Sequence, residues 1–332
     1  MTVDGPAVIL IPTFNDWPAL RRLLIDLDAA LDGRVDNPRV MIVDDGSTAT
    51  PPADLAPGPF RALGRVDALR LRRNLGHQRA IAVGLAYVEA NIPCRAVVVM
   101  DGDGEDAPRD VPRLLDALEG ANDSRVIFAE RTRRSESLAF RVGYAGFRIL
   151  HRVLVGRPVR FGNFSVIPRV RLASLVTVSE LWNHYAASVV KSRQPFATIP
   201  TDRARRLDGR SSMNFVALII HGLGAISVFS EVVGVRLLMA AFGMIGLAVV
   251  GLLAATLIRL ATDLAIPGWA TTVTGFLLIL LVQAVMFAFV FSFLIIGGRQ
   301  GSTFLPCRDY PLYVAGLEPL YPRSAPDRTE HP

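Results

Sequence analysis

The chain has 332 residues, of which 51% are hydrophobic and 20% charged, with two cysteines and a formal net charge of +6. This composition excludes a disordered chain and a disulfide-stapled mini-domain, and the low cysteine count indicates a reducing compartment. The basic balance indicates an anionic partner: nucleic acid, anionic lipid headgroups or a phosphate-bearing substrate. Composition alone does not choose among these three classes.

From residue 7 to about residue 163, short β-rich runs alternate with longer runs of helical periodicity. The predicted strands are Ala7–Ile11, Arg39–Val43, Asp67–Leu71, Ala96–Met100 and Arg125–Ala129. The predicted helices between them are Pro18–Leu31, His77–Ala90 and Val111–Leu118. Such alternation is typical of parallel strands joined by right-handed crossovers. It predicts a doubly wound α/β sheet whose ligands gather beyond the carboxyl ends of the strands.

Acidic and polar residues directly follow the first, second and fourth predicted strands. The segments are residues 12–16 (PTFND), 44–47 (DDGS) and 101–108 (DGDGEDAP). Carboxylates concentrated at the rim of a sheet are unfavourable unless they bind a cation or hydrogen-bond donors. Asp101 and Asp103 are separated by one residue, a spacing that lets both contact one Mg²⁺ or Mn²⁺ together with substrate phosphate oxygens.

Several common motifs are absent from the sequence. No GxGxxG motif follows the first predicted strand, which disfavours a dinucleotide cofactor, and no Walker lysine motif occurs, which argues against an ATPase. The five histidines show no HExxH or similar metal-binding spacing. The acidic rim is therefore the leading candidate for the chemistry.

Two apolar runs without charged residues follow in the C-terminal part of the chain, at about 237–258 and 274–296. Each is long enough for a helix to cross a hydrocarbon core about 30 Å thick. The link between them contains Pro267 and Gly268, which are typical of a turn, and Trp269, which favours the headgroup layer. We therefore expect a hairpin of two transmembrane helices with both ends on the same side of a membrane.

Arginines mark the side of the membrane on which the hairpin ends. Arg236, Arg299 and Arg308 flank the two ends, whereas the connecting loop carries one arginine offset by one aspartate. The positive-inside rule then predicts a multi-pass protein of the inner, cytoplasmic membrane, with a cytoplasmic catalytic domain and C-terminus. We expect no signal peptide, because the first apolar stretch is short and runs into a proline.

These features predict four regions. They are a catalytic domain at residues 1–205, juxtamembrane interfacial helices at 206–236, the two transmembrane helices within 237–298, and a cytoplasmic tail at 299–332. Residues 211–230 are uncharged but include several polar residues, so we expect helices that lie in the membrane interface. A third span, which would put the tail on the opposite face, is the alternative.

Five segments, taken in order, resemble family 2 glycosyltransferases with a GT-A fold. More narrowly, they resemble the membrane-anchored polyprenyl-phosphate glycosyltransferases, the dolichyl-phosphate-mannose-synthase-like group. The segments are residues 11–16 (IPTFND), 43–47 (VDDGS), 74–80 (NLGHQRA) with Gly84, 100–108 (MDGDGEDAP) and 206–211 (RLDGRS). All five occur in the family's order and precede the two-helix hairpin, and the likeness extends from residue 8 to about residue 299.

The resemblance implies a role for each segment. A nucleotide-sugar pocket would be lined by Pro12, Phe14, Asp16, Asp44, Asp45, Gly76 and Asp101. The resemblance also implies a divalent metal, Mg²⁺ or Mn²⁺, held by Asp101, Asp103 and Glu105. Arg206 would neutralise the donor diphosphate, and Arg131 with Arg141 would hold the acceptor phosphate.

The reaction that the resemblance implies is an inverting transfer of a sugar from a nucleotide-diphosphate sugar to a polyprenyl phosphate at the cytoplasmic membrane face. Asp103 and Arg206 would be catalytic, because a metal and an arginine stabilise charge on the leaving diphosphate. An acceptor phosphate is already ionised at neutral pH and needs no strong base. If the acceptor were a lipid hydroxyl, Asp106 or Glu105 would have to accept its proton.

Other interpretations stay open. One is a glycosyltransferase that uses a lipid hydroxyl, and another is a non-catalytic scaffold that binds nucleotide sugar or anionic lipid. A processive polysaccharide synthase is disfavoured, because the sequence lacks Gln-x-x-Arg-Trp. We expect no nucleic-acid partner. The small residues Gly243, Gly246 and Gly251 would permit close helix packing in a homo-oligomer.

Three of these motifs also have simpler explanations. Residues 44–47 could form a plain turn capped by an aspartate. His77 could lie at the start of a helix without touching substrate. The arginines at 203, 205 and 206 could attract anionic lipid rather than act in catalysis.

Overall fold

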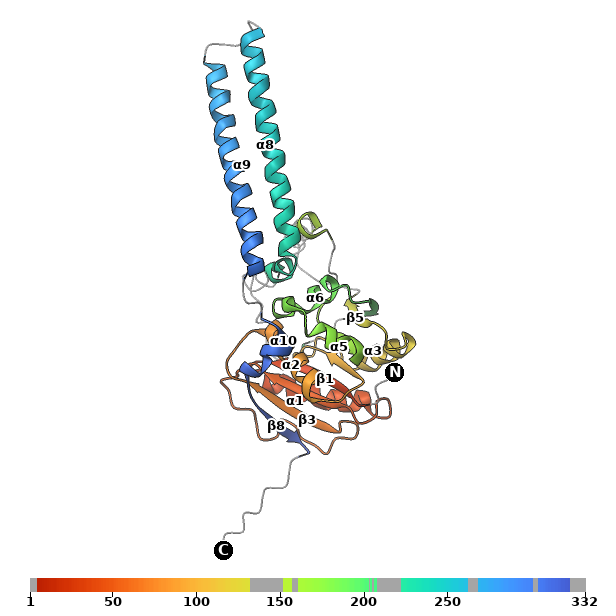
Figure 1. The fold of residues 1–332 in the computed structure, drawn as a ribbon. Coiled ribbons are helices and arrows are strands. Elements are labelled where there is room, and N and C mark those ends of the chain that lie inside the picture. Colours follow the sequence, from red (N-terminus) through yellow and green to blue (C-terminus); the bar gives the residue numbers. More distant parts are fainter. Residues whose placement is uncertain are drawn as a thin grey trace. The chain divides into compact units, whose positions relative to one another are not determined.

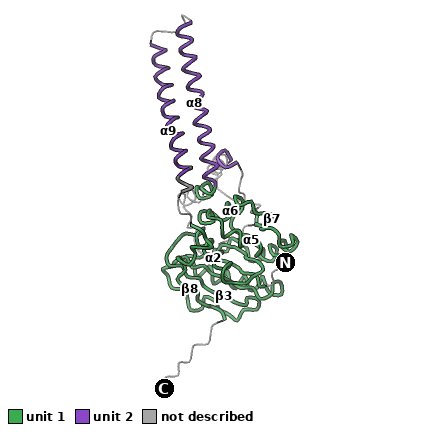
Figure 2. Tube along the Cα trace, in the orientation of Figure 1, with its two compact units in different colours: residues 1–143, 159–228, 303–332 green, residues 144–158, 229–302 purple. Residues whose placement is uncertain are grey.

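The computed structural model describes residues 5–131, 152–156, 161–202, 204, 206–207, 222–261, 268–300 and 304–322. The chain separates into two compact units (Figure 2). The first comprises residues 1–143, 159–228 and 303–332, and the second comprises residues 144–158 and 229–302. The first unit therefore contains chain from both sides of the segment that forms most of the second.

Within the described residues, an 8-stranded sheet forms the centre of the first unit (Figure 1). The strands are β1 (Ala7–Thr13), β2 (Arg39–Asp44), β3 (Arg65–Leu71), β4 (Ala96–Val99), β5 (Val126–Arg131), β6 (Ser165–Pro168), β7 (Phe196–Thr201) and β8 (Val314–Tyr321). Their order across the sheet is β7-β5-β6-β4-β1-β2-β3-β8. β1 pairs in parallel with β2 and β4, β2 with β3, and β5 with β7.

All the strands and helices predicted between residues 7 and 129 are present. β1 begins at Ala7 as predicted and extends to Thr13, and every one of its residues is buried. The sheet is mixed rather than wholly parallel, because β6 runs antiparallel to β4 and β5, and β8 runs antiparallel to β3. Both antiparallel strands come after the alternation of strands and helices on which the prediction was based.

Helices cover both faces of the sheet, as in a doubly wound fold. They are α1 (Trp17–Leu31), α2 (His77–Asn91), α3 (Asp110–Gly120), α5 (Arg169–Leu175), α6 (Tyr185–Lys191) and the 3₁₀ helix η1 (Ser179–Trp182). α1 and α3 share a hydrophobic cluster with Ile9, whereas α2, α5 and α6 share another with Val8. Since successive side chains of a strand point to opposite faces, each buried strand contributes to two cores.

The C-terminal region forms part of this sheet. Sequence analysis set residues 299–332 apart as a tail, but the structure places Val314–Tyr321 at the edge of the sheet beside β3. Two short helices, α10 (Pro306–Asp309) and η2 (Tyr310–Leu312), lead into that strand. Tyr321 packs edge-on against Phe60, with ring centres 4.9 Å apart.

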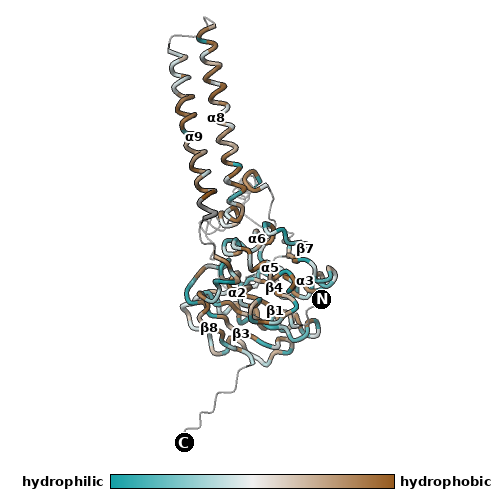
Figure 3. Tube along the Cα trace, viewed as in Figure 1, coloured by the Kyte–Doolittle hydropathy of each residue, from teal (hydrophilic) through white to brown (hydrophobic). Residues whose placement is uncertain are grey.

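Two long helices, α8 (Ser230–Ala261) and α9 (Trp269–Gln300), make up most of the second unit. Ser230–Ala261 and Trp269–Leu294 are long and apolar enough to cross a membrane, with mean hydropathies of 2.5 and 2.7. Figure 3 shows that apolar residues run along both helices. The spans expected at 237–258 and 274–296 lie within α8 and α9.

The two helices pack on each other through small residues. The buried side chains of α8 are Ala241, Ala248 and Ala255, spaced seven residues apart on one face, and Ala284 of α9 is also buried. Large side chains such as Leu247 are exposed. Small residues inside and large apolar residues outside are typical of paired transmembrane helices.

The segments that flank α8 are described only in part, whereas the glycines within it are described. Residues 208–221 and 262–267 lie outside the described residues, so the interfacial helices expected at 211–230 are seen only as a helical stretch at 222–227. A Cβ added at Gly251 would lie 3.1 Å from Leu277 of α9, so this glycine serves packing within the hairpin. A homo-oligomer stays a prediction.

Candidate functional site

The rim loops of the sheet meet because their strands are neighbours. β1 lies between β2 and β4, and Thr13 at its end is opposite Asp44. The carboxyl ends of parallel neighbours lie at one edge of a sheet, where ligands of such folds bind. The segments 12–16, 44–47 and 101–106 are therefore brought together, as their position after the strands predicted.

Asn15 joins the first two of these loops, and sequence analysis did not single it out. Its Oδ1 accepts hydrogen bonds from the N–H groups of Thr48 and Ala49, both at 2.9 Å. Its own N–H donates to Ser47 Oγ at 2.9 Å. Its φ of 56° lies in the left-handed region, which asparagine adopts more readily than most residues. The neighbouring residue Phe14 is 46% exposed.

The other predicted nucleotide-site residues of these two loops differ in exposure. Pro12 is buried within β1, and Asp16 is half-buried directly before α1. Asp44 is buried, and its Oδ1 accepts a hydrogen bond from the Ser47 N–H at 2.9 Å. That bond is the one expected of a turn capped by aspartate. Thr13 Oγ1 is buried and has no hydrogen-bond partner among the described residues.

Asp45 holds the loop that leads into α2. Its two carboxylate oxygens accept hydrogen bonds from the N–H groups of Leu75 and Gly76, at 2.7 and 2.8 Å. Burial raises the pKa of Asp45, while the two N–H donors act in the opposite direction. Gly46 has a φ of 70°, and a Cβ there would lie 2.6 Å from the Arg73 carbonyl carbon. Asp45 and Gly76 are thus in contact, with Asp45 bound to the backbone.

The acidic loop after β4 is folded by its own carboxylates. Asp106 is 3% exposed, and its Oδ2 accepts a hydrogen bond from the Asp101 N–H at 3.0 Å. Asp103 Oδ1 accepts from the Glu105 N–H at 2.9 Å. The side chains of Asp101 and Asp103 remain 30% and 19% exposed. The loop therefore presents two partly accessible carboxylates at the rim.

Arg206 contacts this loop although it lies far from it in the sequence. Its Nη2 lies 3.2 Å from Asp103 Oδ2. The backbone on either side is also attached, because Ala204 N–H donates to Glu105 O and Leu207 N–H donates to Asp103 O, both at 3.0 Å. Arg206 Nε is buried and has no hydrogen-bond partner within the described part of the chain. A partly buried guanidinium with an unused donor suits an anionic ligand.

The charges around Asp103 partly oppose one another. Burial raises the pKa of Asp103, and the nearby carboxylates of Asp101 and Glu105 raise it further. The Glu105 N–H and the Arg206 guanidinium act in the opposite direction. A divalent cation would relieve the repulsion between the two partly exposed aspartates, Asp101 and Asp103.

The carboxylates of the acidic loop suit a Mg²⁺ or Mn²⁺ ion that also binds water and substrate, rather than an ion held by protein ligands alone. Among the described residues, no group of three or more His, Cys, Asp or Glu side chains is arranged to hold a metal ion. The expected trio of Asp101, Asp103 and Glu105 forms no such group among these residues, and its assignment as the metal site stays a prediction. Mg²⁺ is commonly held by one or two carboxylates together with water and substrate phosphates, which Asp101 and Asp103 could supply.

His77 lies against the acidic loop, and it was not among the predicted site residues. Its Nε2 is 3.0 Å from Asp101 Oδ1 and 3.1 Å from Asn163 Nδ2. Gln78 donates to Asn163 Oδ1 at 3.2 Å and accepts from the Tyr185 N–H at 2.7 Å. Desolvation lowers the pKa of His77, but the adjacent acidic groups, Asp101 foremost, outweigh it and raise the pKa.

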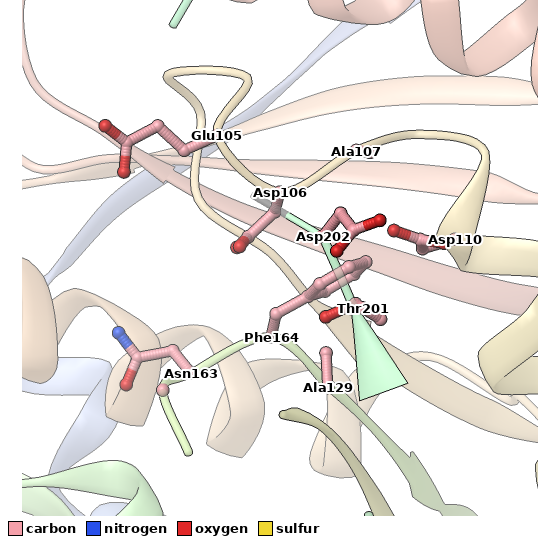
Figure 4. A pocket seen from close by; sticks show the side chains of 10 residues that line it. Glu105, Asp106, Ala107, Asp110, Ala129, Asn163, Phe164, Thr201 and Asp202 are labelled. Atoms are coloured by element: carbon pink, nitrogen blue, oxygen red, sulfur yellow. The ribbon is translucent and has the colours of Figure 1, made fainter. Parts of the chain in front are cut away.

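A pocket adjoins the acidic loop (Figure 4). It is lined by Glu105, Asp106, Ala107, Asp110, Ala129, Gly162, Asn163, Phe164, Thr201 and Asp202. In Figure 4 the Glu105 carboxylate lies on the opposite side from those of Asp110 and Asp202. Carboxylates and amides accept hydrogen bonds from hydroxyl groups, so this lining suits a polyhydroxylated ligand.

The two arginines predicted to hold the acceptor phosphate are not seen in full. Arg131 is the last residue of β5, and its side chain lies outside the described part of the chain, as does all of Arg141. Arg131 is opposite Thr201 of β7, whose side chain lines the pocket. The acceptor assignment stays a prediction.

Comparison with known proteins identifies the catalytic region. Residues 8–170 match the family described as Glycosyl transferase family 2. A protein of Bacillus subtilis named uncharacterized glycosyltransferase YkcC is 24% identical over 314 residues, which cover 92% of each chain. The two chains therefore correspond along most of their length, the C-terminal helices included.

Other relatives match over shorter stretches. The undecaprenyl-phosphate 4-deoxy-4-formamido-L-arabinose transferase of Edwardsiella ictaluri is 30% identical over 115 residues, covering 35% of this chain and 34% of the relative. The Salmonella enteritidis protein of the same name is 22% identical over 215 residues, covering 64% and 63%. The chain thus aligns with about a third to under two thirds of these two transferases.

Among solved structures, glucosyl-3-phosphoglycerate synthase from Mycobacterium tuberculosis in complex with Mg²⁺ and uridine-diphosphate matches with a TM-score of 0.49 at 15% identity. The match covers 70% of this chain and 81% of that chain. The mixed sheet and the matched segment agree with the fold expected from the sequence. The chain therefore carries a family 2 glycosyltransferase domain with a GT-A α/β sheet, followed by two candidate transmembrane helices, and the protein is a glycosyltransferase.

Proposed function

We propose that the protein transfers a sugar, with inversion, from a nucleotide-diphosphate sugar to a polyprenyl phosphate at the cytoplasmic face of a membrane. The observation that carries this proposal is the contact of Arg206 with Asp103 in a loop that also presents Asp101. Two carboxylates for a metal and one arginine for phosphate are the parts that a diphosphate leaving group requires. The names of the undecaprenyl-phosphate transferases support the class of acceptor.

The donor would bind across the rim of the sheet. The exposed Phe14 ring offers a surface for a base or ribose, and Thr13 offers an unused buried hydroxyl. Asp101 and Asp103 would hold Mg²⁺ or Mn²⁺, which when bound neutralises charge on the diphosphate. The Arg206 guanidinium would bind phosphate oxygens and stabilise the leaving group. The pocket beside Asp106 would receive the sugar hydroxyls.

The setting of Asp106 disfavours it as the base that a hydroxyl acceptor would need, which leaves Glu105 of the pocket lining as the candidate base. A hydroxyl acceptor needs a carboxylate that takes up its proton, whereas an ionised phosphate does not. Asp106 is 3% exposed and accepts a hydrogen bond from the Asp101 N–H, so its carboxylate serves to fold the loop. In a single displacement, the acceptor oxygen attacks the sugar from the face opposite the diphosphate, which inverts the configuration.

The sheet also supports a topology with two membrane crossings. β7 and β8 are the two edge strands of one sheet, where β7 pairs with β5 and β8 with β3, so the chain between them must cross a membrane an even number of times. α8 and α9 supply two crossings, which argues against a third span at residues 211–230. Reporter fusions at both termini should both report the cytoplasm, and cysteines in the loop between α8 and α9 should be labelled from outside. A C-terminus found outside would contradict this topology.

Nucleotide release tests the proposed reaction. Purified full-length protein in nanodiscs would be given Mg²⁺ and each of several nucleotide-diphosphate sugars, with polyprenyl phosphate, with polyprenol or with neither lipid. We expect nucleotide release from one donor class that depends on polyprenyl phosphate. Release that depends on polyprenol would favour the hydroxyl acceptor. Nucleotide-sugar binding without release under any condition would favour a binding scaffold and overturn the proposal.

A further inference from the structure

The chain that follows α9 packs against the segment that leads to His77. We call residues 304–313 the tail strap. The Arg72 N–H, at the end of β3, donates a hydrogen bond to the Tyr313 carbonyl oxygen at 2.8 Å. The guanidinium of Arg73 lies 6.0 Å from the centre of the Tyr313 ring. The strap is thus attached at the start of the loop 72–76.

A second contact lies on the other side of His77. Arg79, in the first turn of α2, places its guanidinium 5.1 Å from the centre of the Trp182 ring. The Trp182 ring lies 3.8 Å from that of Phe304 and 5.0 Å from that of Tyr313, measured between centroids. Cation–π and aromatic contacts of this kind have a defined geometry. The strap therefore supports the chain both before and after His77.

The supported segment faces the acidic loop. His77 Nε2 is 3.0 Å from Asp101 Oδ1, and the residues just before it are bound by the carboxylate of Asp45 through the N–H groups of Leu75 and Gly76. The loop 72–76 is therefore held by Asp45 towards the site and by Tyr313 on its outer side. Both attachments lie within the five residues that directly precede His77 in the chain.

We propose that the tail strap positions His77 for binding of the donor diphosphate, so that residues beyond the membrane hairpin complete the donor site. This inference rests on the proposed function. Tyr313 and Trp182 are positioning residues, since their contacts are with Arg73, Arg79 and each other. A loop that is ordered before the ligand arrives binds it more tightly than one that must be ordered on binding.

Binding of nucleoside diphosphates with Mg²⁺ to the full-length protein in nanodiscs is the first test. We expect Tyr313→Ala to raise the dissociation constant about tenfold and the donor KM similarly, with a smaller change in kcat at saturating donor. Tyr313→Phe keeps the ring and should behave like the wild type. Tyr321→Ala is the matched control, because it removes the same ring from the far end of β8, where it packs on Phe60.

A double substitution separates positioning from general destabilisation. If the strap acts through His77, Tyr313→Ala should add little to the loss already caused by His77→Ala. Full, multiplied losses in the double variant would overturn the inference. Equal weakening by Tyr313→Ala and Tyr321→Ala would overturn it as well, because the effect would then follow stability rather than the loop.

Amide hydrogen exchange of residues 72–80 gives a readout that needs no substrate. We expect faster exchange there in Tyr313→Ala and wild-type exchange in Tyr321→Ala. Unchanged exchange in Tyr313→Ala would overturn the strap whatever the protein's activity. Faster exchange in a protein whose wild type binds no nucleoside diphosphate would mean that the strap orders the loop but that the proposed donor site is wrong.

Discussion

The first unit, which contains the sheet and is called the catalytic unit below, buries most of its large apolar side chains, whereas the α8–α9 hairpin exposes most of its own. In the sheet, strand residues such as Val8 and Ile9 are buried between helices. In the hairpin, Leu247, Leu260 and Phe293 are 73%, 80% and 72% exposed, while the buried positions are alanines. Burial away from water stabilises the first arrangement, whereas the second requires apolar surroundings.

Because the two regions differ in this way, substitutions in them should change different properties of the protein. Polar groups of the catalytic unit gather at one rim, where Arg206 and Asp103 meet, so charge changes there should affect chemistry. The hairpin has a close-packed seam around Ala248, so volume changes there should affect stability while the chemistry continues. The four predictions below test that division and are ordered by the size of the effect that we expect.

Neutralising the acidic loop should have the largest effect. Asp101→Asn and Asp103→Asn keep the side-chain size but remove charge that a divalent cation needs, so each should abolish measurable turnover. Asp116→Asn is the control, since Asp116 is 68% exposed and lies away from the rim. Product formation by purified variants is the measurement. Full activity of either loop variant, or of the wild type in EDTA, would mean that turnover needs no divalent cation at this loop.

Arg206→Lys should lower kcat by about 10²–10³-fold, because loss of one preorganised donor to developing charge has that size. Lysine keeps the charge but not the planar fork that binds two oxygens of a phosphate. Arg21→Lys, which alters an exposed arginine paired with Asp54 at 3.0 Å, is the matched control. If kcat of Arg206→Lys at saturating donor stays near that of the wild type, Arg206 acts by attracting lipid.

Ala248→Leu should lower the stability of the hairpin and leave the activity of the catalytic unit unchanged. Ala248 is 1% exposed on the seam of α8, and overpacking a close-packed site typically costs about 1–3 kcal/mol. Val250→Leu, at a position that is 63% exposed, should leave the free energy of unfolding unchanged. Unfolding in mixed detergent micelles measures both. Equal effects of the two variants would mean that Ala248 does not lie at a packed seam.

The smallest effect is expected at the sheet edge. Arg70 and Glu318 form an ion pair between β3 and β8 at 2.6 Å, with both side chains 47% exposed. Exposed pairs of this kind contribute about 0–1 kcal/mol because water and salt screen them. Glu318→Gln should therefore lower the free energy of unfolding by no more than about that amount. A much larger loss in chemical denaturation would mean that β8 is held mainly by this pair.

Local pattern was sufficient for much of the catalytic sheet. β1 and β4 are short aliphatic runs that are buried on both faces, which is why they could be recognised from the sequence. The acidic loop was recognised because its carboxylates directly follow β4. Arg206, which was named through the family resemblance, contacts Asp103 in the structure, and its role towards the donor diphosphate stays a prediction.

Long-range pairing explains what the sequence did not predict. Val314–Tyr321 contains Gly316 and Pro319, both poor strand formers, and it becomes a strand by pairing with β3, which lies far away in the chain. The surroundings of His77 were also not predictable from the local sequence. Its contacts with Asp101 and Asn163 join three distant segments, and the local sequence indicated only the start of a helix.

The mass of the lipid product shows directly whether polyprenyl phosphate accepts the sugar. Full-length protein in nanodiscs would be incubated with the donor that supports nucleotide release, Mg²⁺ and polyprenyl phosphate, beside Asp103→Asn as the inactive control. We expect the wild type to convert polyprenyl phosphate to a species heavier by one glycosyl unit with its phosphate retained, and Asp103→Asn to form none. Nucleotide release without that species, or the same product from Asp103→Asn, would contradict the account.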